Sequence, residues 1–338
     1  MDIQKAINNV INNIDLSHGD MHNLMQTIMK GDATPAQIGG LLVALRIKGE
    51  TVDEITAAAE VMRELAVKVT IDKTHLIDTC GTGGDATNTF NISTASAFVV
   101  AASGAKVAKH GNRSVSSNSG SADVLEAAGV NIELNADQVV SCIENVGIGF
   151  MFAPMHHSAM KHAIGPRREL GIRTLFNVLG PLTNPASAPN QVIGVFDKKW
   201  LNPLAETLKK LGSKNVLVVH SEDGMDEISV SANTYISELK NGEIKDYIIS
   251  PEDFNINKYD ISELAVSDVN ESLIMMNSVF DNSDSAAKSI VALNAGAAIY
   301  ASGISSSIND GVIRALDLIK SGEAKNKYEM LIKYSQSL

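Results

Sequence analysis

Apolar residues in the first 70 positions recur with the period of an α-helix. Positions 3, 6, 7, 10, 11 and 14 are all apolar and share one helical face. Further helices are predicted over residues 21–29, 38–47 and 52–67, because each follows a good N-cap residue. These caps are Ser17, Thr34 and Thr51. The pattern predicts a helical domain over residues 1–72, which packs either against a second subunit or only on its own chain.

From about residue 73, short apolar runs alternate with helical patterns. The predicted strands lie at residues 76–77, 105–108, 149–152, 192–195 and 216–219. The predicted helices lie at residues 94–103, 122–128, 136–146 and 200–211. This alternation is typical of a parallel α/β sheet, so residues 73–338 are predicted to form a larger α/β domain. A hairpin with Asn241-Gly242 as its turn and a buried Ala-rich helix over residues 285–304 are also expected.

The stretch from Asp78 to Ser121 holds most of the candidate chemistry. It contains a glycine-rich turn, Gly81–Asp85, and then a helix for which Ser93 or Thr94 is the expected N-cap. A glycine turn before a helix N-terminus favours anions, because free N–H groups and the helix dipole point at the ligand. Both polar loops of this stretch follow predicted strands, so we expect them at one edge of the sheet.

Positive charge is concentrated beside the glycine turn. Between residues 74 and 160 the only lysines and arginines are Lys106, Lys109 and Arg113, in a chain of formal net charge −11. Two of the three lie in a loop rich in hydroxyl and amide groups, which suit phosphate oxygens. These features together predict a site for a small polyanion.

Residues 154–185 bring further basic side chains and three histidines. The pattern predicts two short helices separated by Gly165-Pro166, and residues of about 162–182 are expected to complete the helical domain. His156 and His157 are adjacent, and His162 lies five positions further on. Zinc ligands on a helix are spaced three or four apart, so the histidines do not favour a zinc site.

A pair of adjacent carboxylates, Asp226 and Glu227, follows a turn and precedes an apolar run. Neighbouring carboxylates repel one another unless solvent or a cation relieves them. The pair is therefore either a solvated turn or, beside a polyphosphate, an anchor for Mg²⁺, which prefers oxygen ligands and substrate phosphates.

Composition limits the classes of partner. The acidic charge balance argues against nucleic acid. The two cysteines, Cys80 and Cys142, are too few for a disulfide framework and fit a reducing compartment. No apolar run approaches 18 residues and the N-terminus lacks a signal-peptide core, so we expect no membrane partner and a cytoplasmic protein.

Six segments, in order, make the chain resemble the anthranilate phosphoribosyltransferases, which have the nucleoside-phosphorylase-like phosphoribosyltransferase fold. They are GTGGD (81–85), NIST (91–94), KHGNRSVSS (109–117), PRRELGIRT (166–174), FNVLGPLTNP (176–185) and MDE (225–227). The resemblance covers nearly the whole chain. It implies a small N-terminal helical domain, a larger α/β domain with a central mostly parallel sheet, and a homodimer through the helical part.

The resemblance also implies an activity, that of a glycosyltransferase in tryptophan biosynthesis. The 5-phosphoribosyl group of 5-phosphoribosyl 1-diphosphate (PRPP) would move to the amine of anthranilate, giving N-(5-phosphoribosyl)anthranilate and diphosphate. Mg²⁺ is the implied cofactor. No general acid or base is implied, because an aromatic amine has a free lone pair and mainly needs placement. The implied positioning residues are Gly81, Lys109, Asn112 and Arg167.

The same resemblance assigns residues to each ligand. The implied PRPP-binding residues are Gly81, Gly84, Asp85, Thr89, Asn91, Ile92, Ser93, Thr94, Lys109, His110, Gly111, Asn112, Arg113, Ser114, Val115, Ser116, Ser117 and Ser121. The implied anthranilate-binding residues are Gly81, Asn112 and Arg167, the last of which suits a carboxylate. The implied metal-binding residues are Ser93, Asp226 and Glu227.

Three alternatives stay open at this point. A pyrimidine nucleoside phosphorylase shares the fold and a related glycine loop, but it binds inorganic phosphate and has no need of the acidic pair. A non-catalytic paralogue would bind a phosphoribosyl metabolite as a regulator. A related transferase would use another aromatic acid, because one arginine and one asparagine do not define a ring.

Overall fold

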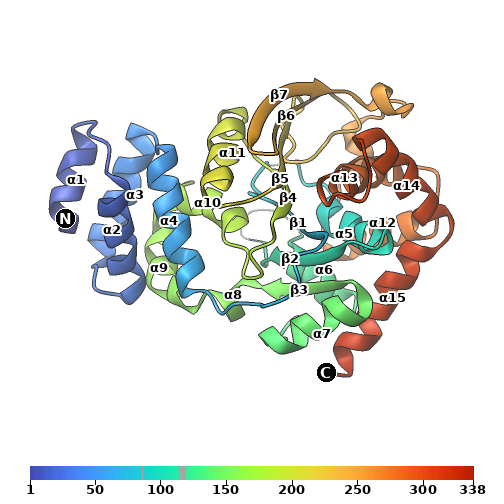
Figure 1. The fold of residues 1–338 in the computed structure, drawn as a ribbon, viewed down its shortest axis with the longest axis horizontal. Helices are drawn as coiled ribbons and strands as arrows, with labels where there is room; N and C mark the ends of the chain where they lie inside the picture. Colours follow the sequence, from blue (N-terminus) through green and yellow to red (C-terminus); the bar gives the residue numbers. More distant parts are fainter. Residues whose placement is uncertain (86, 115–118) are drawn as a thin grey trace.

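The computed structural model describes residues 1–85, 87–114 and 119–338 (Figure 1). Its N-terminal helices are α1 (Ile3–Ile11), α2 (His18–Lys30), α3 (Pro35–Lys48) and α4 (Val52–Leu65). The three predicted caps are confirmed, because the side chains of Ser17, Thr34 and Thr51 each accept the N–H three residues further on. The first helix ends at Ile11, so Ile14 lies outside it.

A second group of short helices joins this bundle from far along the chain. It comprises α8 (Ala153–His156), η1 (Ser158–Met160), α9 (Lys161–Leu170), α10 (Leu175–Leu179) and η2 (Gly180–Leu182). Helix α9 packs against α2 and α3, and α10 packs against α3 and α4. The prediction that Gly165-Pro166 separates two helices is wrong, because both residues lie inside α9. The break falls instead at Gly171, whose φ of 60° is left-handed and ends the helix.

The rest of the chain builds a seven-stranded sheet with the order β3-β2-β1-β4-β5-β6-β7. The strands are β1 (Leu76–Gly81), β2 (Lys106–Gly111), β3 (Ile148–Phe152), β4 (Asn190–Gly194), β5 (Asn215–Ser221), β6 (Thr234–Lys240) and β7 (Glu243–Ile249). Strands β1 to β5 pair with one another in parallel, as predicted, and the predicted hairpin of β6 and β7 is added with β6 antiparallel to both β5 and β7.

Helices cover both faces of the sheet. They are α5 (Ile92–Ala102), α6 (Ser121–Ala127), α7 (Ala136–Val146), α11 (Leu201–Lys210), α12 (Val269–Phe280), α13 (Ala286–Ala301), α14 (Ile308–Lys320) and α15 (Glu323–Gln336). Short 3-10 turns lie at η3 (Lys198–Trp200), η4 (Pro251–Phe254) and η5 (Ile261–Leu264). The expected core helix is α13, almost all of which is buried. None of the described helices is long and apolar enough to cross a membrane.

Two hydrophobic cores meet at the sheet. On β5, Val216 and Val218 belong to the core shared with α11 and the helical bundle, whereas Leu217 and Val219 belong to the core shared with α5 and α13. Alternate residues of a strand point to opposite faces, so each face of the sheet has its own apolar layer. In Figure 1 the bundle therefore lies on the α11 side, and α5, α13 and α15 lie on the other.

The helix that follows the glycine turn begins earlier than predicted. Its N-cap is Asn91, whose Oδ1 accepts the N–H of Thr94 at 3.1 Å, and not Ser93 or Thr94. Both predicted caps instead lie in the first turn of α5. An Asn side chain caps a helix as well as a hydroxyl does, and here the cap falls two residues before the first predicted one.

Candidate functional site

The candidate site lies where the strand order of the sheet changes direction. Strand β1 has β2 on one side and β4 on the other, so the chain moves outward in both directions from this point. In open α/β sheets ligands bind at the carboxyl ends of strands at such a switch point. The residues at these three ends are Gly81, Gly111 and Gly194. The predicted meeting of the two polar loops at one sheet edge is confirmed, because β1 and β2 pair in parallel.

The glycine turn lies against the acidic pair. The N–H of Gly83 donates to Oδ2 of Asp226 at 2.8 Å, and the N–H of Thr82 donates to the carbonyl of Gly194 at 2.9 Å. Asp85 is close enough to Asp226 to raise its pKa by charge repulsion. The sequence indicated the glycine turn and the acidic pair as two separate motifs about 140 positions apart. The structure brings the two motifs into contact.

The two carboxylates of the acidic pair lie in surroundings that disfavour negative charge. Each keeps some solvent-exposed surface, yet protein atoms surround both carboxyl groups. Burial and the charge of Asp85 raise the pKa of Asp226 to about 7. Burial and the charge of Asp226 raise the pKa of Glu227 well above its usual value, although Lys109 and the N–H of Ser93 oppose that shift. Such a pair is poised to gain from a cation.

Lys109 supplies buried positive charge beneath the pair. Its side chain is 2% exposed, and its Nζ donates to the carbonyl of Thr79 at 2.6 Å and to Oγ of Ser93 at 3.2 Å. Burial lowers its pKa, while the carboxylates of Asp78 and Glu227 oppose that shift. A small cavity lined by Thr79, Ser93 and Glu227, among others, joins these groups. Ser93, predicted as a metal ligand, therefore lies between Lys109 and the acidic pair.

A buried carboxylate that the sequence did not single out supports this loop. Asp78 is fully buried, and its oxygens accept the N–H of His110 at 3.1 Å and the side-chain amide of Asn184 at 2.7 Å. Asn184 also donates to the carbonyl of Ala108 at 2.9 Å. The network fixes β1 and β2 relative to the turn that follows η2, so it positions Lys109.

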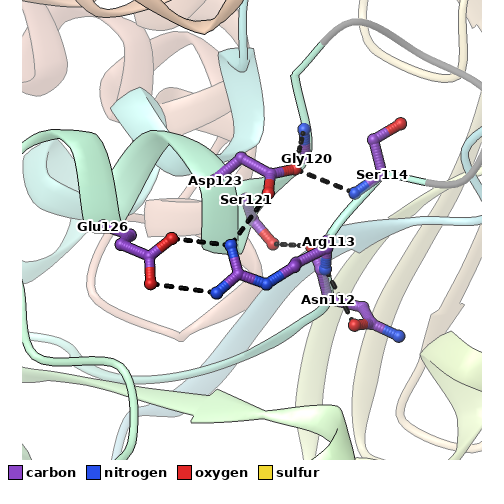
Figure 2. A network of polar contacts seen from close by, with 7 residues as sticks. All are labelled: Asn112, Arg113, Ser114, Gly120, Ser121, Asp123 and Glu126. Carbon is purple, nitrogen blue, oxygen red and sulfur yellow. Dashed lines mark hydrogen bonds and ion pairs between the residues drawn. The ribbon is translucent and has the colours of Figure 1, made fainter.

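The basic loop after β2 is folded back on helix α6 (Figure 2). Oγ of Ser121 donates to the carbonyl of Asn112 at 3.4 Å, so two predicted PRPP ligands are in contact. The guanidinium of Arg113 donates to both carboxylate oxygens of Glu126, at 2.6 and 2.9 Å, and to Asp123 at 3.2 Å. The structure thus pairs Arg113 with carboxylates, and its role as a phosphate ligand stays a prediction. Val115, Ser116 and Ser117 lie outside the described residues.

Other predicted PRPP-binding residues serve the local fold. Thr89 forms a single β-bridge with Ala265. Ile92 and Thr94 are buried at the start of α5. Asn91 caps this helix and donates from Nδ2 to the carbonyl of Ser119 at 3.2 Å. These residues hold the helix N-terminus beside the glycine turn, which leaves contacts with a ligand to neighbouring groups.

Arg167, the predicted carboxylate ligand, lies on α9 and is partly buried. Its guanidinium lies 5.2 Å from the ring centroid of Phe176, and burial lowers its pKa. No carboxylate among the described residues forms an ion pair with it. An arginine held by an aromatic face and lacking such a partner suits an incoming carboxylate.

His110, a predicted PRPP-binding residue, lies near the carboxyl end of β2 beside a second histidine. The ring is buried, lies 5.1 Å from that of His157, and its Nε2 has no hydrogen-bond partner among the described residues. Burial lowers the pKa of His110 well below its usual value and that of His157 to about 4. Both rings are therefore neutral near pH 7, and neither supplies charge to a phosphate.

The structure adds two residues, Arg173 and Asn294, to which sequence reasoning gave no role in the site. The guanidinium of Arg173 donates to the carbonyl of Gly84 and lies 4.2 Å from the ring of Phe196, so the segment after α9 holds the glycine turn. Asn294 on α13 exchanges hydrogen bonds of 2.9 Å with the backbone N–H and carbonyl of Ile228, next to the acidic pair. One feature of the sequence could have indicated Asn294: it is the single amide side chain in the Ala-rich helix α13.

The donor chemistry of the site fits Mg²⁺. The groups at hand are carboxylate and hydroxyl oxygens, the ligands that a hard cation prefers. Across the described ranges, no group of three or more His, Cys, Asp and Glu side chains forms a ready metal cage. Mg²⁺ commonly takes only one or two protein carboxylates and completes its shell with water and substrate phosphates. The pair Asp226-Glu227 offers that arrangement.

Comparisons with known proteins agree with this description. Models of the helical bundle domain and of the α/β domain of a glycosyl transferase family match residues 4–66 and 73–325. The fold and the site thus define a glycosyltransferase made of these two domains. Its relatives are more specific, and the chain belongs to the anthranilate phosphoribosyltransferase family.

The relatives cover the whole chain. The anthranilate phosphoribosyltransferase of Thioalkalivibrio sulfidiphilus is 59% identical over 337 residues, with 100% of both chains covered. That of Marinomonas sp. is 60% identical and covers 99% of this chain and 98% of its own. The crystal structure of the Thermus thermophilus enzyme matches with a TM-score of 0.93 at 39% identity, covering 98% and 99%. The Saccharomyces cerevisiae enzyme in complex with PRPP and Mg matches with a TM-score of 0.89 at 26% identity, covering 99% and 98%.

These matches confirm the predicted fold class and the predicted enzyme class. The relatives reported above carry the name of the transferase and not that of a phosphorylase.

Proposed function

We propose that this chain transfers the 5-phosphoribosyl group of PRPP to the amine of anthranilate at the switch point of its sheet, as a step of tryptophan biosynthesis. The observation that carries the proposal is the contact of the glycine turn with the acidic pair above a buried lysine. The Gly83 N–H meets Asp226 at 2.8 Å, and Lys109 lies 3.2 Å from Ser93. The relatives' shared name and the yeast complex with PRPP and Mg support the same conclusion.

Transfer of the phosphoribosyl group requires that negative charge on the diphosphate be stabilised and that the amine of anthranilate be correctly placed. As the bond from ribose C1 to diphosphate breaks, charge grows on the diphosphate oxygens, and fixed N–H donors and Lys109 are the groups that stabilise it. When bound, Mg²⁺ supplies further positive charge to these oxygens. The amine of anthranilate attacks with its own lone pair, so the residues that orient it, Asn112 and Arg167, contribute by placement.

We assign the metal to Ser93, Asp226 and Glu227. Their oxygens line or adjoin the cavity beside the glycine turn, and burial together with repulsion from neighbouring carboxylates raises the pKa values of both carboxyl groups. A cation bound between them would offset both effects. PRPP would be held by the residues at the ends of β1 and β2 that the family resemblance names. Arg113 is the exception, since Glu126 and Asp123 occupy its guanidinium.

Fluorescence of anthranilate tests the function directly. Decay that requires protein, PRPP and Mg²⁺ together would support the transferase. No decay, together with phosphate-dependent release of base from thymidine or uridine, would mean that the protein is a phosphorylase. A folded protein with neither activity would point to a binding protein or to a different aromatic acceptor.

Replacing Arg167 with alanine should raise the KM for anthranilate about ten- to a hundredfold and leave the KM for PRPP nearly unchanged. A charged hydrogen bond to the carboxylate contributes about 1.5–3 kcal/mol, and each 1.4 kcal/mol is a factor of about ten. Initial rates with each substrate varied in turn would measure the two constants.

Arg168 is the matched control for this variant, because it is the next residue and its side chain is exposed. Arg168→Ala should keep both KM values within about twofold of the parent. An equal rise in both constants for Arg167→Ala would instead indicate a structural role through its contact with Phe176.

We also propose a domain division at about residue 72, with residues 162–182 completing the helical domain.

We further propose a homodimer through the helical domain. Exposed apolar side chains support the dimer: Ile47 is 80% exposed, Ile11 62% and Ile164 46%, all on α1, α3 and α9. Light scattering should give twice the 35.9 kDa chain mass, and Ile47→Asp should lower it. A monomeric mass for the parent chain would refute the dimer.

Location in the cytoplasm stays a prediction from the cysteine content.

A further inference from the structure

One carboxylate binds the backbone that follows β2 on both sides of residues 115–118. Oδ2 of Asp123, on α6, accepts the backbone N–H of Ser114 at 2.9 Å and that of Gly120 at 3.1 Å (Figure 2). Ser114 and Gly120 lie on the two sides of the loop. One oxygen therefore joins the outgoing and the returning backbone.

The backbone is also packed closely at this point. A Cβ on Gly120 would lie 2.3 Å from the nitrogen of Ser114 and 2.8 Å from the carbonyl carbon of Arg113, distances that real Cβ atoms do not show. Only glycine permits this approach, because it has no Cβ. The two sides of the loop thus touch through backbone atoms, and Asp123 holds them there.

The second oxygen of Asp123 ties in the neighbouring side chain. Its Oδ1 accepts from Nη1 of Arg113 at 3.2 Å, and Glu126 holds the rest of that guanidinium at 2.6 and 2.9 Å. Asp123 thus accepts from two amides and one cation, whereas Glu126, among the described residues of the loop, is bonded to Arg113 alone. The two carboxylates can therefore be separated by mutation.

The residues beside this junction are those assigned to the phosphoribosyl group. Asn112 precedes it and Ser121 follows it, and the two are joined by the bond from Ser121 Oγ to the Asn112 carbonyl at 3.4 Å. Ala122 also donates its N–H to that carbonyl at 3.2 Å. A shift of either backbone would move Asn112 and Ser121 apart.

We propose that Asp123 is a positioning residue for PRPP: by joining the backbones of Ser114 and Gly120 it holds Asn112 and Ser121 in place to bind the phosphoribosyl group. The inference rests on the proposed function, because it assumes that PRPP binds at this loop. Asp123 itself points at backbone amides and Arg113 and needs no contact with substrate.

The test compares Asp123→Ala, Asp123→Asn and Glu126→Gln with the parent enzyme, whose activity is measured first. In Asp123→Ala we expect the KM for PRPP to rise about ten- to a hundredfold and amide hydrogen exchange at Ser114 and Gly120 to speed up. The KM for anthranilate should rise by a smaller factor, because Arg167 on α9 still binds its carboxylate when Asn112 shifts. Asparagine keeps one oxygen acceptor, so Asp123→Asn should show a smaller rise and partly restored protection. Glu126→Gln should keep the PRPP KM within about threefold.

The possible failures are distinguishable. An inactive parent enzyme would refute the proposed function rather than the role of Asp123. An active parent with an unchanged PRPP KM in both Asp123 variants would overturn the inference, as would an equal rise in both KM values. If Asp123→Ala does not fold, Asp123→Asn and the exchange rates decide. A PRPP KM in Glu126→Gln as high as in Asp123→Asn would move the role to Arg113.

Discussion

The double variant Asp226→Asn, Glu227→Gln should lose at least about a hundredfold in kcat/KM, with no recovery at high Mg²⁺. The amides keep the size of the side chains but remove the negative charge that attracts the cation. Asparagine still offers an oxygen to the Gly83 N–H, so the local fold has its hydrogen bond. Because both carboxyl groups have raised pKa values, neutral amides relieve repulsion and the midpoint of thermal unfolding should stay equal or rise. Fluorescence rates across a Mg²⁺ titration and circular dichroism measure both effects.

A neighbouring carboxylate provides the control. Glu222 is exposed and accepts the hydroxyl of Tyr235 at 2.8 Å, so Glu222→Gln changes the net charge by one unit without touching the cavity. Its Mg²⁺ dependence should match the parent. If the double variant also kept the parent's Mg²⁺ dependence, Asp226 and Glu227 would serve only to support the glycine turn and the metal would bind elsewhere.

Local features of the fold were predictable because they depend on residues a few positions apart. The capping boxes at Thr34 and Thr51 each involve one side chain and a backbone three residues away. The hairpin turn at Asn241-Gly242 needs two residues with left-handed backbone, and both have positive φ. Even so, choices among equivalent local candidates failed, since Asn91 rather than a hydroxyl caps α5.

The predicted break at Gly165-Pro166 failed for a related reason. A proline removes one helical hydrogen bond, yet it does not by itself set where a helix ends. Helix α9 continues through Pro166, which is buried, and stops where Gly171 adopts left-handed backbone. Packing of α9 against α2 and α3 outweighs the local cost, and that packing is invisible in the sequence around residue 166.

The candidate site likewise combines residues that local motifs indicate with contacts that depend on the tertiary fold. Motif spacing indicated which residues carry the chemistry, but not which distant groups hold them. Gly83 follows β1 and Asp226 follows β5, and although they are 143 positions apart they meet because both strands flank β4. The supports at Asn294 and Arg173 reach the site from α13 and from the segment after α9. Such contacts depend on the tertiary fold, so a single sequence shows them at most as an unexplained polar residue.

Gly194→Ala should disable the site from a position that carries no functional group. A Cβ there would lie 1.4 Å from the carbonyl oxygen of Asp226 and 2.4 Å from its carbonyl carbon, so the peptide must move by more than an ångström. The Asp226 carboxylate and its bond from Gly83 would move with it. We expect kcat/KM to fall about a hundredfold and the free energy of unfolding to fall by about 3 kcal/mol. Urea unfolding and fluorescence rates under saturating Mg²⁺ measure the two.

Gly19→Ala is the matched control, because a Cβ on Gly19 would meet no atom within 4 Å and the residue lies within helix α2. Alanine suits a helix better than glycine, so this variant should be as active as the parent and slightly more stable. Wild-type kcat/KM in Gly194→Ala would show that the Asp226 peptide has room to shift without cost, and that the site does not depend on close packing of β4 against the acidic pair. A loss of activity with unfolding energy unchanged would mean that the displaced carboxylate alone accounts for the effect.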